Sequence, residues 1–163
     1  YKDIVCIILG KGPGMDLALS IGKRLGILGK HVFFPGFVEE TLFREYINLF
    51  DIGYLESFNT LGYKAMIGSK MQYYMSYGKP TISGNNGERK ILLEDAGILI
   101  DPCEPTLESF KKYVENLTEA IRLLLDDEKL RITLGKNARK KARMLFDCKI
   151  VAKKTYKVYK KVY

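Results

Sequence analysis

Apolar residues alternate along the first hundred positions between short continuous runs and stripes at helical spacing. Residues 4–9 form a continuous run rich in β-branched side chains, which closes at a glycine turn and is followed by leucine and isoleucine every three or four positions. A run of this kind is typical of a strand that is covered on both faces, as in a parallel sheet. Similar runs at 31–34 and 52–55 are also followed by helical patterns. The pattern therefore predicts repeated strand, turn and helix units.

The second half of the chain adds two strands and then becomes helical. We expect strands at 80–83 and 97–100, and beyond them an apolar stripe over 107–124 that indicates a core-facing helix. Further helices are expected from about 128 to 145 and from about 150 to 163. Strands that alternate with helices predict the α/β class, as a Rossmann-like doubly wound parallel sheet with a helical C-terminal extension. We interpret residues 1–163 as one domain, with the sheet region in about 1–102 and the closing helices in 103–163.

Composition and single residue types exclude several classes of function. The chain is 47% hydrophobic and 28% charged, as expected of a folded globular protein, and its longest apolar stretch is far shorter than the ~20 residues of a membrane span. Cys6, Cys103 and Cys148 lie far apart, and His31 is the single histidine, so neither a disulfide framework nor a two-histidine metal site is expected. We expect a cytoplasmic location and no cofactor.

The net charge of +8 belongs to the end of the chain. Eleven of the 27 Lys and Arg residues lie within 136–163, against Asp147 as the one acidic residue there, whereas the other 16 basic and 18 acidic residues nearly balance. This basic tail is either a solvated helix face, a surface that binds anionic lipid, or a surface that binds nucleic acid. Nucleic acid is disfavoured because no recognised binding motif accompanies the charge.

Three glycine turns follow predicted strands, where open α/β sheets bind ligands. They lie at 10–14, 35–38 and 67–70. A dinucleotide fingerprint is excluded because Met15 stands where its third glycine would be. The Walker motif is excluded as well, because Gly12 follows Gly10-Lys11 and Pro80 follows Gly78-Lys79, where Ser or Thr is required.

The turn at Gly68, Ser69 and Lys70 permits two interpretations. In one, Ser69 caps a buried helix and Lys70 is solvated. In the other, the amides near Gly68 and Ser69 receive a diphosphate with help from the helix dipole, while Lys70 or Lys79 supplies the positive charge. The residues alone do not decide between them.

The order of motifs resembles the C-terminal, donor-binding half of group 1 glycosyltransferases with the GT-B fold. The resemblance covers nearly the whole chain and is carried by these segments: "CIILGKGPG", "HVFFPGFV", "LFDIGYL", "KMQYYMSYGKPTISGNNG", "LLEDAGILIDP" and the closing "LRITLGKNARKKARMLFDCKIVAKKTYKVY". The resemblance implies a domain that binds a nucleotide-diphosphate sugar in the cytoplasm for glycan biosynthesis. It also implies that the acceptor-binding half is absent and lies in a longer chain or a partner chain.

The paired glutamates of the family are missing. With residues 78–80 as the anchor, the second glutamate falls on Tyr73 and the first on Ala65, while the family's intervening glycine falls on Gly68. A shifted alignment would place Glu56 at the first position, and we keep it as a possible catalytic substitute. Lys90 stands where a further family glutamate is usual.

The resemblance implies a hexosyltransferase that retains the anomeric configuration and stabilises the departing diphosphate. The resemblance implies four kinds of contact with the donor nucleotide sugar. Two glycines let the backbone come close to it, other residues contact its base and its diphosphate, and a tyrosine contacts its ribose. These residues are Gly10, Gly12, Phe37, Val38, Gly68, Ser69, Lys70, Tyr73 and Lys79. The alternative is a non-catalytic sugar-nucleotide-binding or structural subunit with a basic tail that binds a membrane surface, and which sugar, base and acceptor are used stays open.

Overall fold

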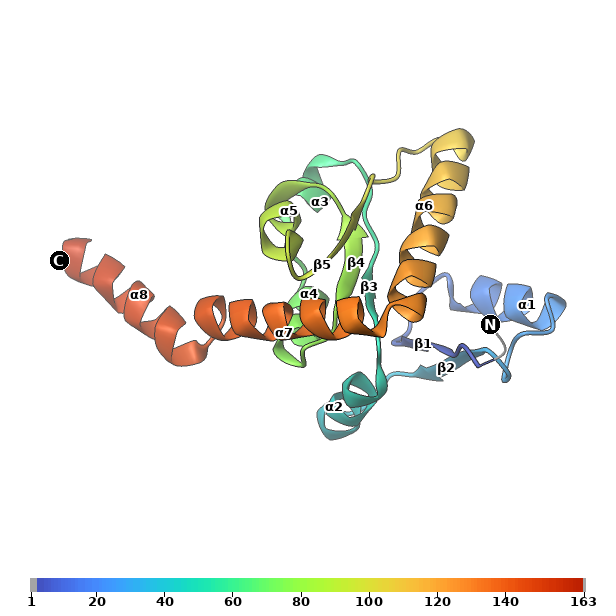
Figure 1. Ribbon diagram of the computed structural model, residues 1–163, viewed down its shortest axis with the longest axis horizontal. Coiled ribbons are helices and arrows are strands. Elements are labelled where there is room, and N and C mark those ends of the chain that lie inside the picture. Colours follow the sequence, from blue (N-terminus) through green and yellow to red (C-terminus); the bar gives the residue numbers. More distant parts are fainter. Residues whose placement is uncertain (1–2, 163) are drawn as a thin grey trace. The chain divides into compact units, whose positions relative to one another are not determined.

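The computed structural model describes residues 3–162 of the chain (Figure 1). Contacts between Cα atoms divide it into two compact units, and the division falls between Tyr46 and Ile47. We call residues 3–46 the N-terminal unit and residues 47–162 the C-terminal unit. Each is described by itself, and the interpretation of the chain as one domain stays a prediction.

The N-terminal unit contains two parallel strands and a helix between them. Strand β1 (Cys6–Leu9) pairs with β2 (Val32–Gly36), and helix α1 (Met15–Arg24) connects them. Leucines at helical spacing continue in the sequence to Leu28, but α1 ends at Arg24 because Gly26 and Gly29 adopt left-handed backbone angles, with φ of 67° and 74°. Helix α2 (Glu40–Leu49) begins in this unit and crosses into the next.

The C-terminal unit is built on a parallel sheet of three strands. Its order is β3 (Gly53–Leu55), β4 (Thr81–Gly84) and β5 (Gly97–Ile100), close to the predicted ranges. All four residues of β4 are buried, as expected for a central strand that is covered on both faces. The α/β class with parallel sheets and closing helices is therefore confirmed.

Six helices lie wholly within the C-terminal unit. The sequence predicted four of them, and the structure bounds these at α4 (Ser69–Ser76), α6 (Leu107–Asp126), α7 (Glu128–Leu145) and α8 (Cys148–Val162). The other two, α3 (Leu61–Ala65) and α5 (Gly87–Leu93), were not predicted. With five and seven residues, these helices are too short to display a helical period in the sequence.

Two apolar clusters hold the helices on the sheet. One cluster joins α4 to α7 and contains Met71, Met75 and Ala138, which are 0% exposed. The other packs α6 and α7 against β4 and β5, with Leu124 at its centre. Helix α4 is thus fixed along its buried face, and its first turn follows the loop that leaves β3.

Candidate functional site

Helix α4 begins at a glycine without a side-chain cap. Gly68 is its N-cap and adopts a φ of 84°, a left-handed conformation that favours glycine, and Ser69 is already the first helical residue. The interpretation of Ser69 as the cap is therefore wrong. Because no side chain caps this end, the first-turn amides of α4 remain suited to an anion.

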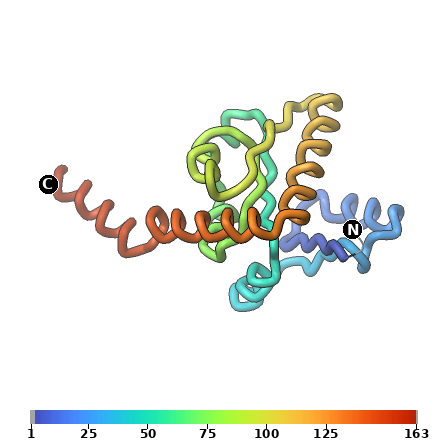
Figure 2. The backbone as a smooth tube through the Cα atoms, in the orientation of Figure 1, coloured from blue at the N-terminus to red at the C-terminus, as the bar shows by residue number. Residues whose placement is uncertain are grey.

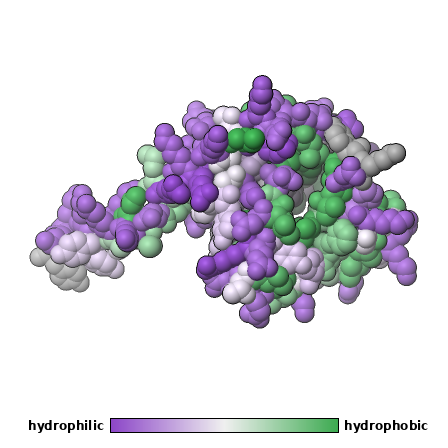
Figure 3. All heavy atoms as spheres, turned by 60° about the horizontal axis from the view of Figure 1, so that its bottom comes forward, coloured by the Kyte–Doolittle hydropathy of each residue, from purple (hydrophilic) through white to green (hydrophobic). Residues whose placement is uncertain are grey.

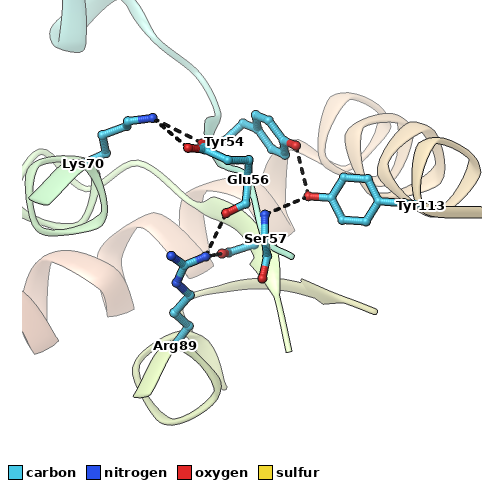
Figure 4. A network of polar contacts seen from close by, with 7 residues as sticks. Tyr54, Glu56, Ser57, Lys70, Arg89 and Tyr113 are labelled. Atoms are coloured by element: carbon cyan, nitrogen blue, oxygen red, sulfur yellow. Dashed lines mark hydrogen bonds and ion pairs between the residues drawn. The ribbon is translucent and has the colours of Figure 1, made fainter. Parts of the chain in front are cut away.

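Lys70 lies in the first turn of α4 and forms an ion pair with Glu56, the residue that follows β3. The Lys70 Nζ atom lies 3.2 Å from Glu56 Oε2 and 3.3 Å from Oε1 (Figure 4). Both side chains are partly exposed, at 56% and 41%, so the pair is screened by water and contributes at most about 1 kcal/mol. The structure thus places a lysine and a carboxylate beside the start of α4.

Arg89 of α5 is the main polar anchor of the loop between β3 and α4. Its guanidinium donates to the carbonyl oxygen of Glu56 at 2.8 Å (Figure 4). It also donates to the carbonyl oxygen of Met66 at 3.2 Å and to Ser83 Oγ at 3.4 Å. It also lies 5.5 Å from the centre of the Tyr63 ring, a cation–π distance. Because Glu56 and Met66 stand near the two ends of this loop, one side chain ties both ends to β4 and α5.

The burial of Arg89 affects the pKa of its guanidinium. The residue is 1% exposed, and this burial lowers the pKa of its guanidinium, while the nearby Glu56 carboxylate acts in the opposite direction. Sequence reasoning missed Arg89. No local pattern pointed to it, because α5 is too short to display a helical period and the partners of Arg89 come from other elements.

A second polar group fixes the same loop from the side of α6. The hydroxyl groups of Tyr54 and Tyr113 lie 3.0 Å apart, and the Ser57 amide donates to Tyr113 Oη at 3.3 Å (Figure 4). Ser57 Oγ in turn donates to Asn86 Oδ1 at 3.1 Å. Burial raises the pKa of the Tyr54 phenol, and its hydrogen bond with Tyr113 raises that pKa further. The phenol therefore stays neutral and available for hydrogen bonding.

The remaining predicted residues of the C-terminal unit lie farther along α4. Tyr73 is on the second turn and is 43% exposed. Lys79 follows the C-terminal end of the helix, where its Nζ atom donates to the Asn48 carbonyl at 2.8 Å, and burial lowers its pKa. An eight-residue helix is about 12 Å long, so Lys70 rather than Lys79 lies at the candidate anion site.

The predicted residues of the N-terminal unit lie on two adjoining turns. The Gly10 amide donates to the Gly36 carbonyl at 2.8 Å, which joins the turn after β1 to the turn after β2. An added Cβ atom at Gly12 would meet no atom within 4 Å, so the backbone there is open to a ligand. Phe37 is 72% exposed and Val38 is half-buried.

Two further properties bear on the chemistry. Within residues 3–162, no group of three or more His, Cys, Asp or Glu side chains is arranged to hold a metal ion. The same residues contain no helix that is long and apolar enough to cross a bilayer.

Comparison with models of protein families shows to which family the chain belongs. A model described as glycosyl transferases group 1 matches residues 1–141. The chain belongs to the group 1 glycosyltransferase family. The resemblance predicted from the motif order is therefore confirmed.

Solved structures confirm the fold of this group 1 chain. It is similar to HepE from Anabaena, a structure in complex with UDP-glucose, with a TM-score of 0.78, 20% identity, and coverage of 99% of this chain and 42% of that one. It is also similar to the C-terminal domain of the group 1 protein LpcC from Francisella tularensis, with a TM-score of 0.71, 17% identity, and coverage of 91% and 72%. The fold is thus that of one half of GT-B glycosyltransferases.

One curated relative of this family member is an enzyme with a lipid-linked substrate. The chain is 36% identical over 75 residues to N,N'-diacetylbacillosaminyl-diphospho-undecaprenol alpha-1,3-N-acetylgalactosaminyltransferase of Campylobacter jejuni. The match covers 40% of this chain and 20% of the relative. The group 1 chain therefore spans only a minor part of this relative and of HepE.

Proposed function

We propose that this chain is the donor-binding half of a retaining hexosyltransferase and holds the diphosphate of a nucleotide sugar at the start of α4. The observation that carries the proposal is the helix start itself, where Gly68 leaves the first amides uncapped and Lys70 supplies a positive charge beside them. Free amides, the helix dipole and a lysine together favour a diphosphate. The complex of the similar protein HepE with UDP-glucose supports the ligand class.

In this proposal the chemical work of the site is stabilisation of the leaving group. As the bond between the sugar and the diphosphate breaks, negative charge grows on the departing phosphate oxygens. The amides at Gly68 and Ser69 are donors already fixed by the fold, so they stabilise that charge with little reorganisation, and the Lys70 ammonium, which pairs with Glu56 in the structure, adds positive charge beside them. Tyr73, on the next turn of the same helix, is the proposed partner of the ribose hydroxyls.

Glu56 is the proposed substitute for the missing glutamate nearest the sugar. Ala65 and Tyr73 provide no carboxylate, yet the Glu56 carboxylate reaches to 3.2 Å from Lys70 at the start of α4. Its backbone carbonyl is held by Arg89 at 2.8 Å, so its position is set by a buried side chain. A carboxylate therefore stands at this helix start through a different segment of the chain.

The remaining donor contacts follow from the resemblance. Gly10 and Gly12 are the proposed points of close backbone approach, and Phe37 and Val38 the proposed contacts of the base. Lys79 stays a further predicted donor contact, although its ammonium group is engaged by Asn48 in the structure.

The acceptor belongs to a second half, in the same protein or in a partner chain. Because the Campylobacter jejuni relative is named for a substrate linked to undecaprenol diphosphate, we propose lipid-linked sugars as the first acceptor class to test. The competing function is a non-catalytic subunit that binds sugar nucleotides. It is favoured by the absence of carboxylates at Ala65 and Tyr73, and it predicts donor binding without transfer when the acceptor half is supplied.

Calorimetric titration tests the proposal. The chain is titrated with UDP, GDP and ADP and with UDP- and GDP-sugars, and the titrations are repeated with Lys70→Met and Tyr73→Phe. A hydrogen bond to a charged group contributes about 1.5–3 kcal/mol, so Lys70→Met should weaken binding by about 10- to 100-fold. Lys112→Met, at an exposed position of α6, is the matched control and should leave binding unchanged.

Two results would remove the proposal. One is the absence of saturable binding at millimolar concentrations of every nucleotide. The other is binding that Lys70→Met and Lys112→Met weaken equally, because that would reflect general charge attraction rather than a site at α4.

A further inference from the structure

Lys70, the proposed partner of the diphosphate, already has a carboxylate beside it. Its Nζ atom lies 3.2 Å from Glu56 Oε2 and 3.3 Å from Oε1, so both carboxylate oxygens share the ammonium group. In Figure 2 the backbone leaves β3, turns through α3 and continues into α4, so the loop that starts at Glu56 leads to the helix that carries Lys70. Glu56 and a diphosphate therefore compete for the same positive charge.

The side chains of this pair are free to change partners while the backbone of Glu56 stays fixed. Hydrophilic spheres are spread over the face drawn in Figure 3, and Lys70 and Glu56 are likewise partly exposed, at 56% and 41%. Exposed side chains change rotamer within picoseconds to nanoseconds. The Glu56 carbonyl, in contrast, accepts from Arg89 at 2.8 Å, and the next residue, Ser57, is 1% exposed and donates its amide to Tyr113. Rotation of the Glu56 side chain alone thus releases Lys70.

A diphosphate is a stronger partner for Lys70 than Glu56 is. It carries more negative charge than one carboxylate, and it also accepts from the uncapped amides at the start of α4. Once it binds, the Glu56 carboxylate lies beside a second anion and needs a new hydrogen-bond donor. Arg89 compensates part of this charge, because burial lowers the pKa of its guanidinium and the Glu56 carboxylate counteracts that effect.

We propose that Glu56 sets the preference of the site for a nucleotide sugar over the free nucleoside diphosphate, an inference that rests on the proposed function. The hexose of a nucleotide sugar is joined directly to the diphosphate and provides hydroxyl groups, which donate to the displaced carboxylate. The end of a free nucleoside diphosphate provides only phosphate oxygens, which are acceptors and repel the carboxylate. Glu56 therefore opposes binding of the diphosphate and favours binding of the complete donor.

The same preference favours turnover. The nucleoside diphosphate is what remains in the site when the sugar has passed to the acceptor. The sugar hydroxyl groups leave with the sugar, so Glu56 returns to Lys70 and weakens the hold on the remaining diphosphate. Release of product limits the rate of many enzymes, and Glu56 speeds that step.

Calorimetric titration of Glu56→Gln tests the inference. The probes are UDP, UDP-glucose and UDP-N-acetylgalactosamine, together with GDP and GDP-mannose, and the wild-type chain should bind at least one of these sugar nucleotides more tightly than its diphosphate. An exposed ion pair changes an equilibrium constant by up to about fivefold, so Glu56→Gln should tighten binding of the diphosphate by up to that factor. Loss of a hydrogen bond to a charged group costs about tenfold, so the preference for the sugar nucleotide should fall by about tenfold.

The matched control is Glu115→Gln, which removes the same charge from an exposed position of α6 and should change every constant by less than about twofold. The inference is overturned if the wild-type chain shows no preference for a sugar nucleotide, or if Glu56→Gln leaves that preference unchanged or weakens binding of the diphosphate. Should Lys70→Met still weaken binding in that case, the proposed function is retained. If none of the probes binds, the proposed function fails and this inference fails with it.

The ¹³C resonance of the Glu56 carboxyl carbon, assigned by its absence from the spectrum of Glu56→Gln, gives a second readout. It should shift when the diphosphate is added and should reach a different position with the sugar nucleotide, because the carboxylate then accepts from hydroxyl groups. The same position with both ligands, or no shift with either, would contradict the exchange of partners.

Discussion

Replacement of Arg89 of α5 by methionine should strongly destabilise the loop between β3 and α4, which this side chain anchors. Methionine fills much of the same space but cannot donate, so it leaves two backbone carbonyls, those of Glu56 and Met66, without their partner. It also leaves Ser83 Oγ, on a residue that is 0% exposed, without this donor.

The expected loss follows from these contacts. An unsatisfied buried acceptor costs about 1–3 kcal/mol. Both carbonyls are only part-buried and water can reach them, so the two together should give about 2 kcal/mol, the lower end of the summed range. This is a large part of the 5–15 kcal/mol by which a typical domain is stable. Because the loop leads into Gly68, the same variant should also weaken nucleotide binding.

Urea unfolding at neutral pH, followed by far-UV circular dichroism because the chain contains no tryptophan, measures this loss. Lys90→Met is the matched control, since it makes the same change at the next, exposed position of α5. A loss below about 1 kcal/mol for Arg89→Met, or one equal to that of Lys90→Met, would refute the reasoning that Arg89 holds the loop.

Two further predictions concern helix α7. Gly135→Ala should destabilise the chain by about 1–3 kcal/mol in the same urea assay, because the added Cβ would lie 2.2 Å from the Gly78 carbonyl oxygen, whereas Lys136→Ala at the next, exposed position should not. Asp95→Asn should cost up to about 1 kcal/mol at pH 7, because it removes the ion pair with Lys141. The hydrogen bond from Lys141 lowers the pKa of Asp95, so this contribution is present above its ordinary value of 3.8 and fades as the pH falls through the folded pKa; an equal effect of Asp95→Asn at pH 7 and pH 2 would contradict it.

The order of elements could be predicted from the sequence because each long element carries its own period. The continuous apolar runs of β1 and β5 indicate parallel strands, and the stripe of α6 indicates a core-facing helix. The expectation that β1 is covered on both faces is wrong, because none of its four residues is buried. The bounds of α7, residues 128–145, agree with the predicted range of about 128 to 145. Asp127 accepts from the Leu130 amide as an N-cap and thereby fixes where the helix starts.

The candidate site could be predicted only in part. The helix start at Gly68 was identified from a glycine and a lysine that lie two positions apart in the sequence. The anchors of the same loop were not identified. Arg89 lies 33 positions from the Glu56 carbonyl to which it donates, and Tyr113 lies 56 positions from the Ser57 amide from which it accepts. Such long-range hydrogen bonds leave no local period in a sequence. The pair of Glu56 and Lys70 was likewise visible only once the fold brought residues 14 positions apart together.

The central claim is that a diphosphate binds at the first turn of α4, and amide chemical shifts test it most directly. The ¹H–¹⁵N spectrum of the chain is recorded while UDP is added, with uridine as the control that lacks the diphosphate. The account predicts that the amides of Gly68, Ser69 and Lys70 shift in a saturable manner with UDP and not with uridine. Shifts confined to other parts of the chain, or equal shifts with both ligands, would contradict it.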